Sequence, residues 1–167
     1  ITLDLSSREI DIKKFCDLIN KCNKIIFISN ASTIDPISNI DCINEKDIEE
    51  SIYTNYINPS KIILNILKSQ KQFVIINITS GAAFMTNTKL AIYSASKASM
   101  HRFIEILKEE EKNNPKALYV DNFDPGRMQT EMQSNLIESK QLDNNFGALN
   151  KPEKIADDIY KLTGRYI

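Results

Sequence analysis

Short continuous apolar runs alternate along the chain with segments in which apolar residues recur at helical spacing. Such runs are typical of parallel strands that are covered on both faces. Three of them have the length of one strand: residues 24–29 (KIIFIS), 72–79 (QFVIINIT) and 116–123 (KALYVDNF). The helical spacing predicts four helices, at residues 8–22, 45–69, 91–112 and 153–162. Strands and helices in this alternation predict an α/β fold built on a doubly wound parallel sheet.

One residue inside a predicted helix and three further segments need separate comment. Pro59 lies inside the helix predicted over 45–69 and should cause a local irregularity, because proline has no N–H to donate. The opening ITL predicts the end of a strand at residues 1–3, and KLTGRYI predicts the start of another at residues 161–167. Residues 131–150 are polar, and the pattern leaves their structure open.

Composition narrows the class of protein. We expect a single domain over residues 1–167, which is long enough to bury a core. The net charge of −1 and the lack of a basic block argue against a nucleic-acid partner, and no apolar run is long enough to cross a membrane. The three cysteines lack metal-ligand spacing and no signal peptide is visible, so we expect reduced thiols in a cytoplasmic protein.

Small and polar residues follow each predicted strand. They are Ser29-Asn30-Ala31-Ser32, Thr79-Ser80-Gly81 and Asp124-Pro125-Gly126. Ligands of doubly wound sheets bind at the carboxyl ends of the strands. The active site is therefore expected at this edge of the sheet.

Ser80, Tyr93 and Lys97 suggest a proton-transfer group at that edge. Tyr93 and Lys97 stand four residues apart on a predicted helix and share one face, where the ammonium should lower the pKa of the phenol. Such a tyrosine can protonate a carbonyl oxygen that Ser80 holds in place. No side chain is a hydride donor, so a nicotinamide cofactor would be required. A tyrosine and a lysine at this spacing are also common as a surface pair, and Ser80 at a strand end makes the pattern more specific.

Over nearly its whole length the chain resembles the short-chain dehydrogenase/reductase family. The family's catalytic Asn, Ser, Tyr and Lys correspond to Asn55, Ser80, Tyr93 and Lys97. In the family the asparagine holds a water that relays protons to the lysine. Taken without the other three residues, Asn55 fits a solvated helix residue better.

The resemblance also implies a set of cofactor-binding residues. DPGRMQTEMQ (124–133) resembles the family's Pro-Gly loop, in which backbone groups near Met128 and the hydroxyl of Thr130 would bind the nicotinamide carboxamide. SNAS (29–32) stands where the family has Asn-Asn-Ala-Gly and departs from that pattern at Ser29 and Ser32. Asp4 would hydrogen-bond the adenine, although a loop or cap acid is an equal reading. The implied cofactor contacts are Asp4, Asn30, Ala31, Tyr93, Lys97, Pro125, Gly126, Met128 and Thr130.

The family's glycine-rich phosphate turn is not found among the four glycines. We therefore expect residues 1–167 to form a single NAD(P)-binding domain of the Rossmann type, incomplete at the N-terminus and lacking its first two strands and helices. In the order 3-2-1-4-5-6 the first strand is central, so its loss would leave residues 24–29 as an apolar edge.

Within the family the chain looks most like the sepiapterin reductase and benzil reductase branch. That resemblance implies reduction of a small ketone or diketone, favours NADP(H) over NAD(H), and implies a homodimer or homotetramer formed through the two long helices. The first alternative is a non-catalytic dinucleotide-binding or sensing protein of the same fold. A sugar-nucleotide epimerase or dehydratase is a further one, disfavoured by the short C-terminal region.

For the remaining candidates the sequence predicts either no catalytic role or two alternative roles. His101, the one histidine, is expected on the exposed side of its helix without a catalytic role. Several apolar residues either line a substrate pocket or pack on the core: Phe84, Met85, Leu90, Met128, Met132, Leu136, Leu142 and Phe146.

Overall fold

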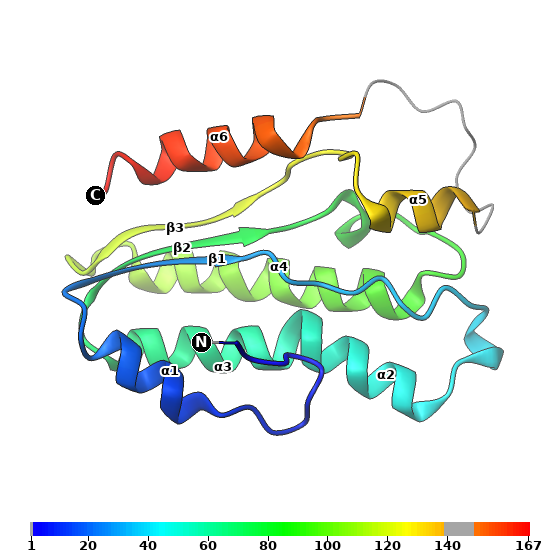
Figure 1. Cartoon of the computed structure of the whole chain (residues 1–167), viewed down its shortest axis with the longest axis horizontal. Helices are drawn as coiled ribbons and strands as arrows, with labels where there is room; N and C mark the ends of the chain where they lie inside the picture. The colour runs from blue at the N-terminus through cyan, green and yellow to red at the C-terminus, as the bar shows by residue number, and fades with distance from the viewer. Residues whose placement is uncertain (1, 139–148) are drawn as a thin grey trace.

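The fold is built on a parallel three-stranded sheet (Figure 1). The computed structural model describes residues 2–138 and 149–167. The strands lie in the order β1-β2-β3, with bounds β1 Lys24–Ser29, β2 Gln72–Ile78 and β3 Ala117–Phe123. The three apolar runs therefore end within one residue of the observed strands, and the predicted parallel sheet is confirmed.

Helices cover both faces of the sheet, as the doubly wound prediction requires. The helices are α1 Ile12–Ile19, α2 Glu45–Ile52, α3 Asn58–Lys68, α4 Ala91–Glu111, α5 Glu131–Glu138 and α6 Pro152–Thr163. Helices α3 and α4 pack on one face together with α1, and α6 packs on the other. None of the helices in the described parts of the chain is long and apolar enough to cross a membrane.

The central strand β2 shows why its sequence is a continuous apolar run. Phe73 and Ile75 point into the core formed with α3 and α4, whereas Val74 and Ile76 point to the side of α6. All four are at most 2% exposed. A strand buried on both faces favours apolar residues at successive positions. The one buried polar residue of β2, Asn77, has a partner, because its amide donates to the Asn122 side-chain oxygen at 2.8 Å.

The helix predicted over 45–69 is interrupted near its middle. A π-helical turn, Tyr53–Ile57, joins α2 to α3, and Pro59 stands in the first turn of α3. Pro59 has no N–H to donate to the carbonyl of Asn55, which lies four residues earlier, so the regular ladder cannot continue. This confirms the predicted irregularity and sets Asn55 inside a π turn, a feature that is frequent at functional sites.

The N-terminal strand predicted at residues 1–3 is wrong for the residues that the structure describes. The segment from residue 2 has no paired strand beside it, and β1 pairs with β2 alone in the described sheet. Its backbone is held by a side chain instead, because the buried Asn58 amide donates to the carbonyls of Leu5 and Ser7, both at 2.8 Å. Leu3 and Leu5 pack against the hydrophobic core to which α3 contributes.

The strand predicted to start within residues 161–167 is also wrong. Helix α6 continues to Thr163, and the residues after it form no strand. The Tyr166 ring stacks on Tyr119 of β3, with centroids 5.5 Å apart, and Lys24 donates to the Tyr166 carbonyl. Packing across the face of the sheet replaces the expected pairing at its edge.

Candidate active site

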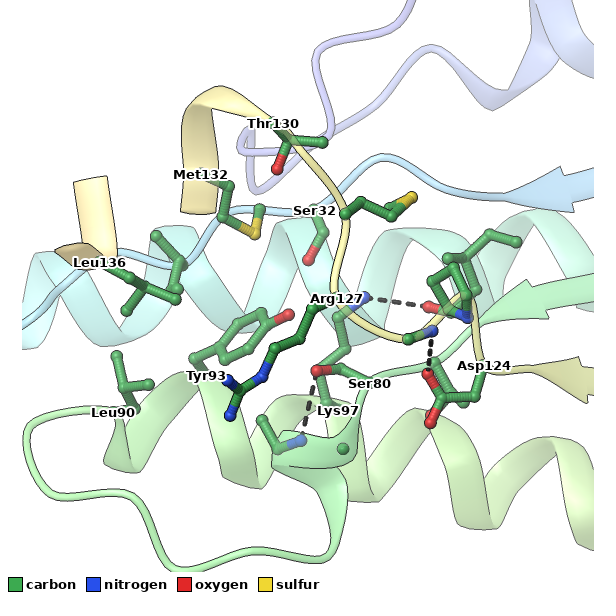
Figure 2. Close-up of a pocket in the computed structure, with 18 of the residues that line it drawn as sticks. Ser32, Ser80, Leu90, Tyr93, Lys97, Asp124, Arg127, Thr130, Met132 and Leu136 are labelled. Carbon is green, nitrogen blue, oxygen red and sulfur yellow. Dashed lines mark hydrogen bonds between the residues drawn. The ribbon is translucent and has the colours of Figure 1, made fainter. Parts of the chain in front are cut away.

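A cavity of about 500 Å³ opens at the carboxyl ends of the strands, where the sequence predicted the site (Figure 2). The loops after β1, β2 and β3 each contribute to its lining, and the first turns of α4 contribute Tyr93 and Lys97. The volume lies within the range of small-molecule sites.

Ser80, Tyr93 and Lys97 all line this one cavity. Ser80 lies two residues after the end of β2, and its hydroxyl accepts a hydrogen bond from the Ala82 N–H at 3.2 Å, which caps the short helical turn Gly81–Ala83. Tyr93 and Lys97 are 7% and 8% exposed. A strand end and a helix start thus bring together three groups that are spread over eighteen residues of sequence.

Burial controls the protonation of the tyrosine and the lysine. The pKa of Tyr93 is raised, chiefly by burial and further by the negative charge of Asp124, while a hydrogen bond with Ser80 acts in the opposite direction. Burial lowers the pKa of Lys97 to about 8. The expected lowering of the tyrosine pKa is therefore wrong for this structure. The Lys97 ammonium donates to the Ile78 carbonyl at 3.1 Å and lies 5.8 Å from the centroid of the Tyr93 ring.

Asn55 is only 4% exposed, which excludes the solvated-helix reading. Its amide oxygen accepts from the Ser32 hydroxyl at 2.9 Å and from the Thr33 N–H at 2.8 Å. Its amide nitrogen donates to the Thr33 carbonyl at 2.8 Å and to the Ser96 hydroxyl at 3.0 Å. Asn55 thus ties the loop after β1 to α4 beside Lys97. Ser32, where the family pattern has glycine, is accommodated because its hydroxyl joins this network.

The loop after β3 is held by Asn150, a residue that the sequence did not single out. Its amide donates to the Pro125 carbonyl at 2.9 Å, and its backbone N–H donates to the Arg127 carbonyl at 2.8 Å. The Gln129 N–H in turn donates to the Asn150 carbonyl at 3.0 Å. Gly126 has φ +66°, and a β-carbon there would come within 3.2 Å of the Asn150 amide nitrogen. A contact over more than twenty residues leaves no periodic signal in the sequence.

Replacing Gly126 with alanine is expected to lower the free energy of unfolding by about 1–2 kcal/mol, because a left-handed backbone strains a residue with a β-carbon. Gly81→Ala is the matched control, since its φ is ordinary and its nearest neighbour would be 3.7 Å away. Urea unfolding of both variants measures the difference. Equal effects at the two positions would show that backbone strain at Gly126 does not shape the loop.

Most of the predicted cofactor-binding residues meet in the cavity. The lining includes Asn30, Ala31, Tyr93, Lys97, Pro125, Gly126, Met128 and Thr130. Asp4 does not line it: this residue is exposed, and its carboxylate accepts from the backbone N–H and the hydroxyl of Ser6, which lowers its pKa. The amide, hydroxyl and ammonium donors of the lining, beside a loop that a glycine keeps open, fit the polar groups of a nicotinamide riboside.

The other end of the cavity is apolar. Ile34, Leu90 and Leu136 are buried in one cluster with Tyr93, and Met132 packs against it. Met85 and Met128 also line the cavity, so five of the apolar candidates are assigned to the pocket: Met85, Leu90, Met128, Met132 and Leu136. Phe84 is 67% exposed and is not part of the lining. Leu142 and Phe146 lie outside the described residues.

His101 is more enclosed than its helix position suggested. Its side chain is 17% exposed, and its Nδ1 lies 3.2 Å from the Thr79 hydroxyl. The Phe84 ring packs edge-on against it, with centroids 4.6 Å apart. The expected exposure is wrong because the loop after β2 folds over this part of α4. His101 does not line the cavity that holds Tyr93.

A parallel α/β sheet with a Ser-Tyr-Lys group at its carboxyl edge is the arrangement that the sequence resemblance implied. Residues 1–141 match the family described as short chain dehydrogenase. This match covers most of the chain, and the chain therefore belongs to the short-chain dehydrogenase/reductase family.

Individual relatives agree with the branch that the sequence suggested. The chain is 25% identical over 167 residues to a benzil reductase ((S)-benzoin forming) of Bacillus cereus, which covers 94% of this chain and 67% of that protein. It is 27% identical over 121 residues to a sepiapterin reductase of Xenopus tropicalis, which covers 68% of this chain and 45% of that protein. The chain thus spans between about half and two thirds of the length of these relatives.

Solved structures confirm the Rossmann-type fold. A 4-hydroxyisoleucine dehydrogenase mutant complexed with NADH and succinate superposes with a TM-score of 0.78 at 22% identity, covering 100% of this chain and 73% of the other. A short-chain dehydrogenase from Sphingobium yanoikuyae in complex with NADPH superposes with a TM-score of 0.75 at 21% identity, covering 97% and 62%. At this identity the likeness establishes the fold alone.

Proposed function

We propose that the protein is an NAD(P)H-dependent oxidoreductase that reduces a carbonyl group, in a ketone or diketone, to an alcohol. The observation that carries this proposal is that Ser80, Tyr93 and Lys97 line one cavity at the carboxyl edge of the sheet. Membership of the short-chain dehydrogenase family and the similarity to benzil reductases support it.

Ser80 and Tyr93 have different roles in protonating the substrate. The cofactor supplies the hydride when it is bound. The Ser80 hydroxyl donates to the carbonyl oxygen and orients it beside the Tyr93 phenol. Because the pKa of Tyr93 is raised, the phenol carries its proton at neutral pH and can transfer it to that oxygen as negative charge develops there.

Lys97 and Asn55 support the proton donor in this mechanism. The Lys97 ammonium, near the face of the Tyr93 ring, stabilises the phenolate that remains after proton transfer. Asn55 completes the relay to Lys97 as the family resemblance implies. Two observations support this role: its amide bonds to Ser96, the residue before Lys97, and Pro59 has no N–H for its backbone carbonyl.

The cavity residues would hold the nicotinamide end of the cofactor. Lys97 would contact the ribose, and the Thr130 hydroxyl and the backbone near Met128 would bind the carboxamide. Asn30 and Ala31 would support the adenosine ribose, and Asp4 the adenine. NADP(H) is proposed over NAD(H) from the resemblance to the benzil and sepiapterin reductase branch.

Titration of the protein with NADPH and with NADH, followed by a panel of aromatic diketones, tests the function. We expect both cofactors to bind, NADPH more tightly, and at least one diketone to be reduced. Binding of cofactor without turnover of any carbonyl would favour the non-catalytic alternative. No binding of either cofactor would contradict the proposal.

We further propose a homodimer or homotetramer, formed through the surfaces of α2–α3 and α4, and a cytoplasmic location. The three cysteines are unpaired, which supports a reducing compartment. Size-exclusion chromatography with light scattering measures the oligomeric state directly.

A further inference from the structure

One face of α4 meets three successive residues at the carboxyl end of β2. The residues of this face stand four apart in the sequence, so they lie one above the other: Tyr93, Lys97 and His101. The contacts that they make are Lys97 with the Ile78 carbonyl at 3.1 Å, His101 with the Thr79 hydroxyl at 3.2 Å, and Tyr93 with the Ser80 hydroxyl. The proposed proton transfer involves Tyr93, Lys97 and Ser80 but gives no role to the contact between His101 and Thr79.

His101 contacts the chain on both sides of Ser80. Its Nδ1 faces the hydroxyl of Thr79, the residue before Ser80. Its ring packs edge-on with the ring of Phe84, four residues after Ser80, with centroids 4.6 Å apart. Between these two contacts lies the turn that the Ser80 hydroxyl caps. The imidazole therefore fixes the segment that carries Ser80 against α4, the helix that also carries Tyr93.

The His101 imidazole has partners of its own that set its protonation. The Glu105 carboxylate lies 3.6 Å from Nε2 and favours the tautomer that carries its proton there. In this tautomer Nδ1 is an acceptor, so the Thr79 hydroxyl donates to it. The side chain of His101 is 17% exposed, and water therefore competes little for this hydrogen bond.

The backbone on both sides of the contact is also held. The His101 carbonyl accepts from the Asn122 amide at 3.0 Å, and the Asn122 side-chain oxygen accepts from the Asn77 amide at 2.8 Å. These two bonds join α4 to β3 and β2. The Thr79 N–H donates to the Phe123 carbonyl at 3.0 Å, which fixes Thr79 to the sheet. The hydrogen bond between His101 and Thr79 thus connects two rigid elements.

We propose that His101 is a positioning residue, which acts through Thr79 to hold the Ser80 hydroxyl in place against the Tyr93 phenol. This inference rests on the proposed function and adds a residue that lies outside the cavity. His101 does not line the cavity, so it exchanges no proton with the substrate. Its effect is geometric, because a displacement of about 1 Å in a group that orients the substrate can lower the rate roughly 100-fold.

The kinetic test uses variants of His101 and Thr79 with NADPH and the best diketone of the panel. His101→Leu should lower kcat by about 10–100-fold and leave cofactor affinity unchanged, because no residue of the cavity is altered. His101→Asn should restore most of kcat, since its amide stands near the position of Nδ1 and can accept from the Thr79 hydroxyl.

Thr79→Val removes the hydroxyl, keeps the branched shape and should lower kcat as His101→Leu does. The double variant should be no slower than either single variant, because both changes break the same hydrogen bond. Ser99→Ala is the control on the same helix: it removes an exposed hydroxyl that donates to the Ala95 carbonyl, and kcat should not change.

Amide NMR of the protein without cofactor tests the same contact without turnover. The Ala82 N–H donates to the Ser80 hydroxyl, so its chemical shift follows the position of that hydroxyl. Thr79→Val should move the Ala82 resonance, and Thr79→Ser, which keeps a hydroxyl, should leave it close to its original position. Both variants retain the His101 ring, so a change in ring current does not contribute.

The outcomes separate this inference from the proposed function. If the Ala82 resonance moves as expected while no carbonyl is ever reduced, the positioning of Ser80 stands and the proposed reduction fails. If carbonyls are reduced but kcat is the same in His101→Leu, or His101→Asn is as slow as His101→Leu, the inference is overturned. Should His101→Leu not fold, Thr79→Val decides, because full kcat and an unmoved Ala82 resonance in that variant would also overturn it.

Discussion

Tyr93→Phe is expected to lower kcat for carbonyl reduction by about 10²–10⁴-fold, the usual contribution of a positioned acid or base. Phenylalanine keeps the ring that packs with Ile34, Leu90 and Leu136, so the fold and the apolar end of the cavity should persist. What disappears is the hydroxyl, whose raised pKa keeps it protonated at neutral pH. Steady-state kinetics with the best diketone of the panel measures the loss.

The control for this variant is Tyr160→Phe, which removes a hydroxyl from a side chain of α6 that is 72% exposed. It should change neither kcat nor cofactor affinity. Cofactor titration of Tyr93→Phe should give an affinity close to that of the unmodified protein, because the phenol acts on the substrate oxygen. Full turnover in Tyr93→Phe would refute the assignment of the proton donor.

The strands and helices that position the site could be predicted because burial leaves a direct trace in the sequence. Strand β2 lies between two layers of helices, and burial on both faces accounts for its continuous run of apolar residues. Pro59 likewise marks the interruption that holds Asn55. The chain ends were mispredicted, because a short apolar segment becomes a strand only beside a partner strand. The N-terminal segment is held instead by the side chain of Asn58, which donates to the carbonyls of Leu5 and Ser7.

The membership of the site could be predicted from spacing and resemblance, but its electrostatics could not. Spacing places Tyr93 and Lys97 on one face, and from that alone the lysine should lower the tyrosine pKa. The structure reverses the direction, because burial acts on both groups and the ammonium turns to the Ile78 carbonyl. Asn150 was missed for a different reason. Its hydrogen bonds join loops that are distant in sequence, which no local pattern encodes.

Lys97→Met is expected to have two opposite effects: loss of turnover by about 10²–10⁴-fold and a gain in stability at pH 7. Lys97 is almost fully buried, and its pKa falls from 10.5 to about 8 because burial disfavours the ammonium. A shift of this size corresponds to roughly 3 kcal/mol of destabilisation when the group is charged in both states. Methionine removes that cost but also the hydrogen bond to Ile78, worth about 1 kcal/mol, so the net gain is about 2 kcal/mol.

The pH dependence of this gain separates it from a change in packing. Below pH 8 the lysine is charged in the folded and the unfolded protein, so the full cost applies. Between pH 8 and 10.5 the unfolded chain binds more protons than the folded one, so the unmodified protein gains stability as the pH rises. Urea unfolding should therefore give Lys97→Met a higher free energy of unfolding than the unmodified protein at pH 7, and this difference should shrink toward pH 10.5. The exposed control Lys154→Met should show no such trend. A pH-independent difference would mean that Lys97 carries no buried charge. A difference that shrinks with rising pH would mean that the buried ammonium beside Tyr93 lowers the stability of the folded protein at neutral pH. A lysine whose role is only structural is not expected to lower stability, so this result would favour a functional role for Lys97.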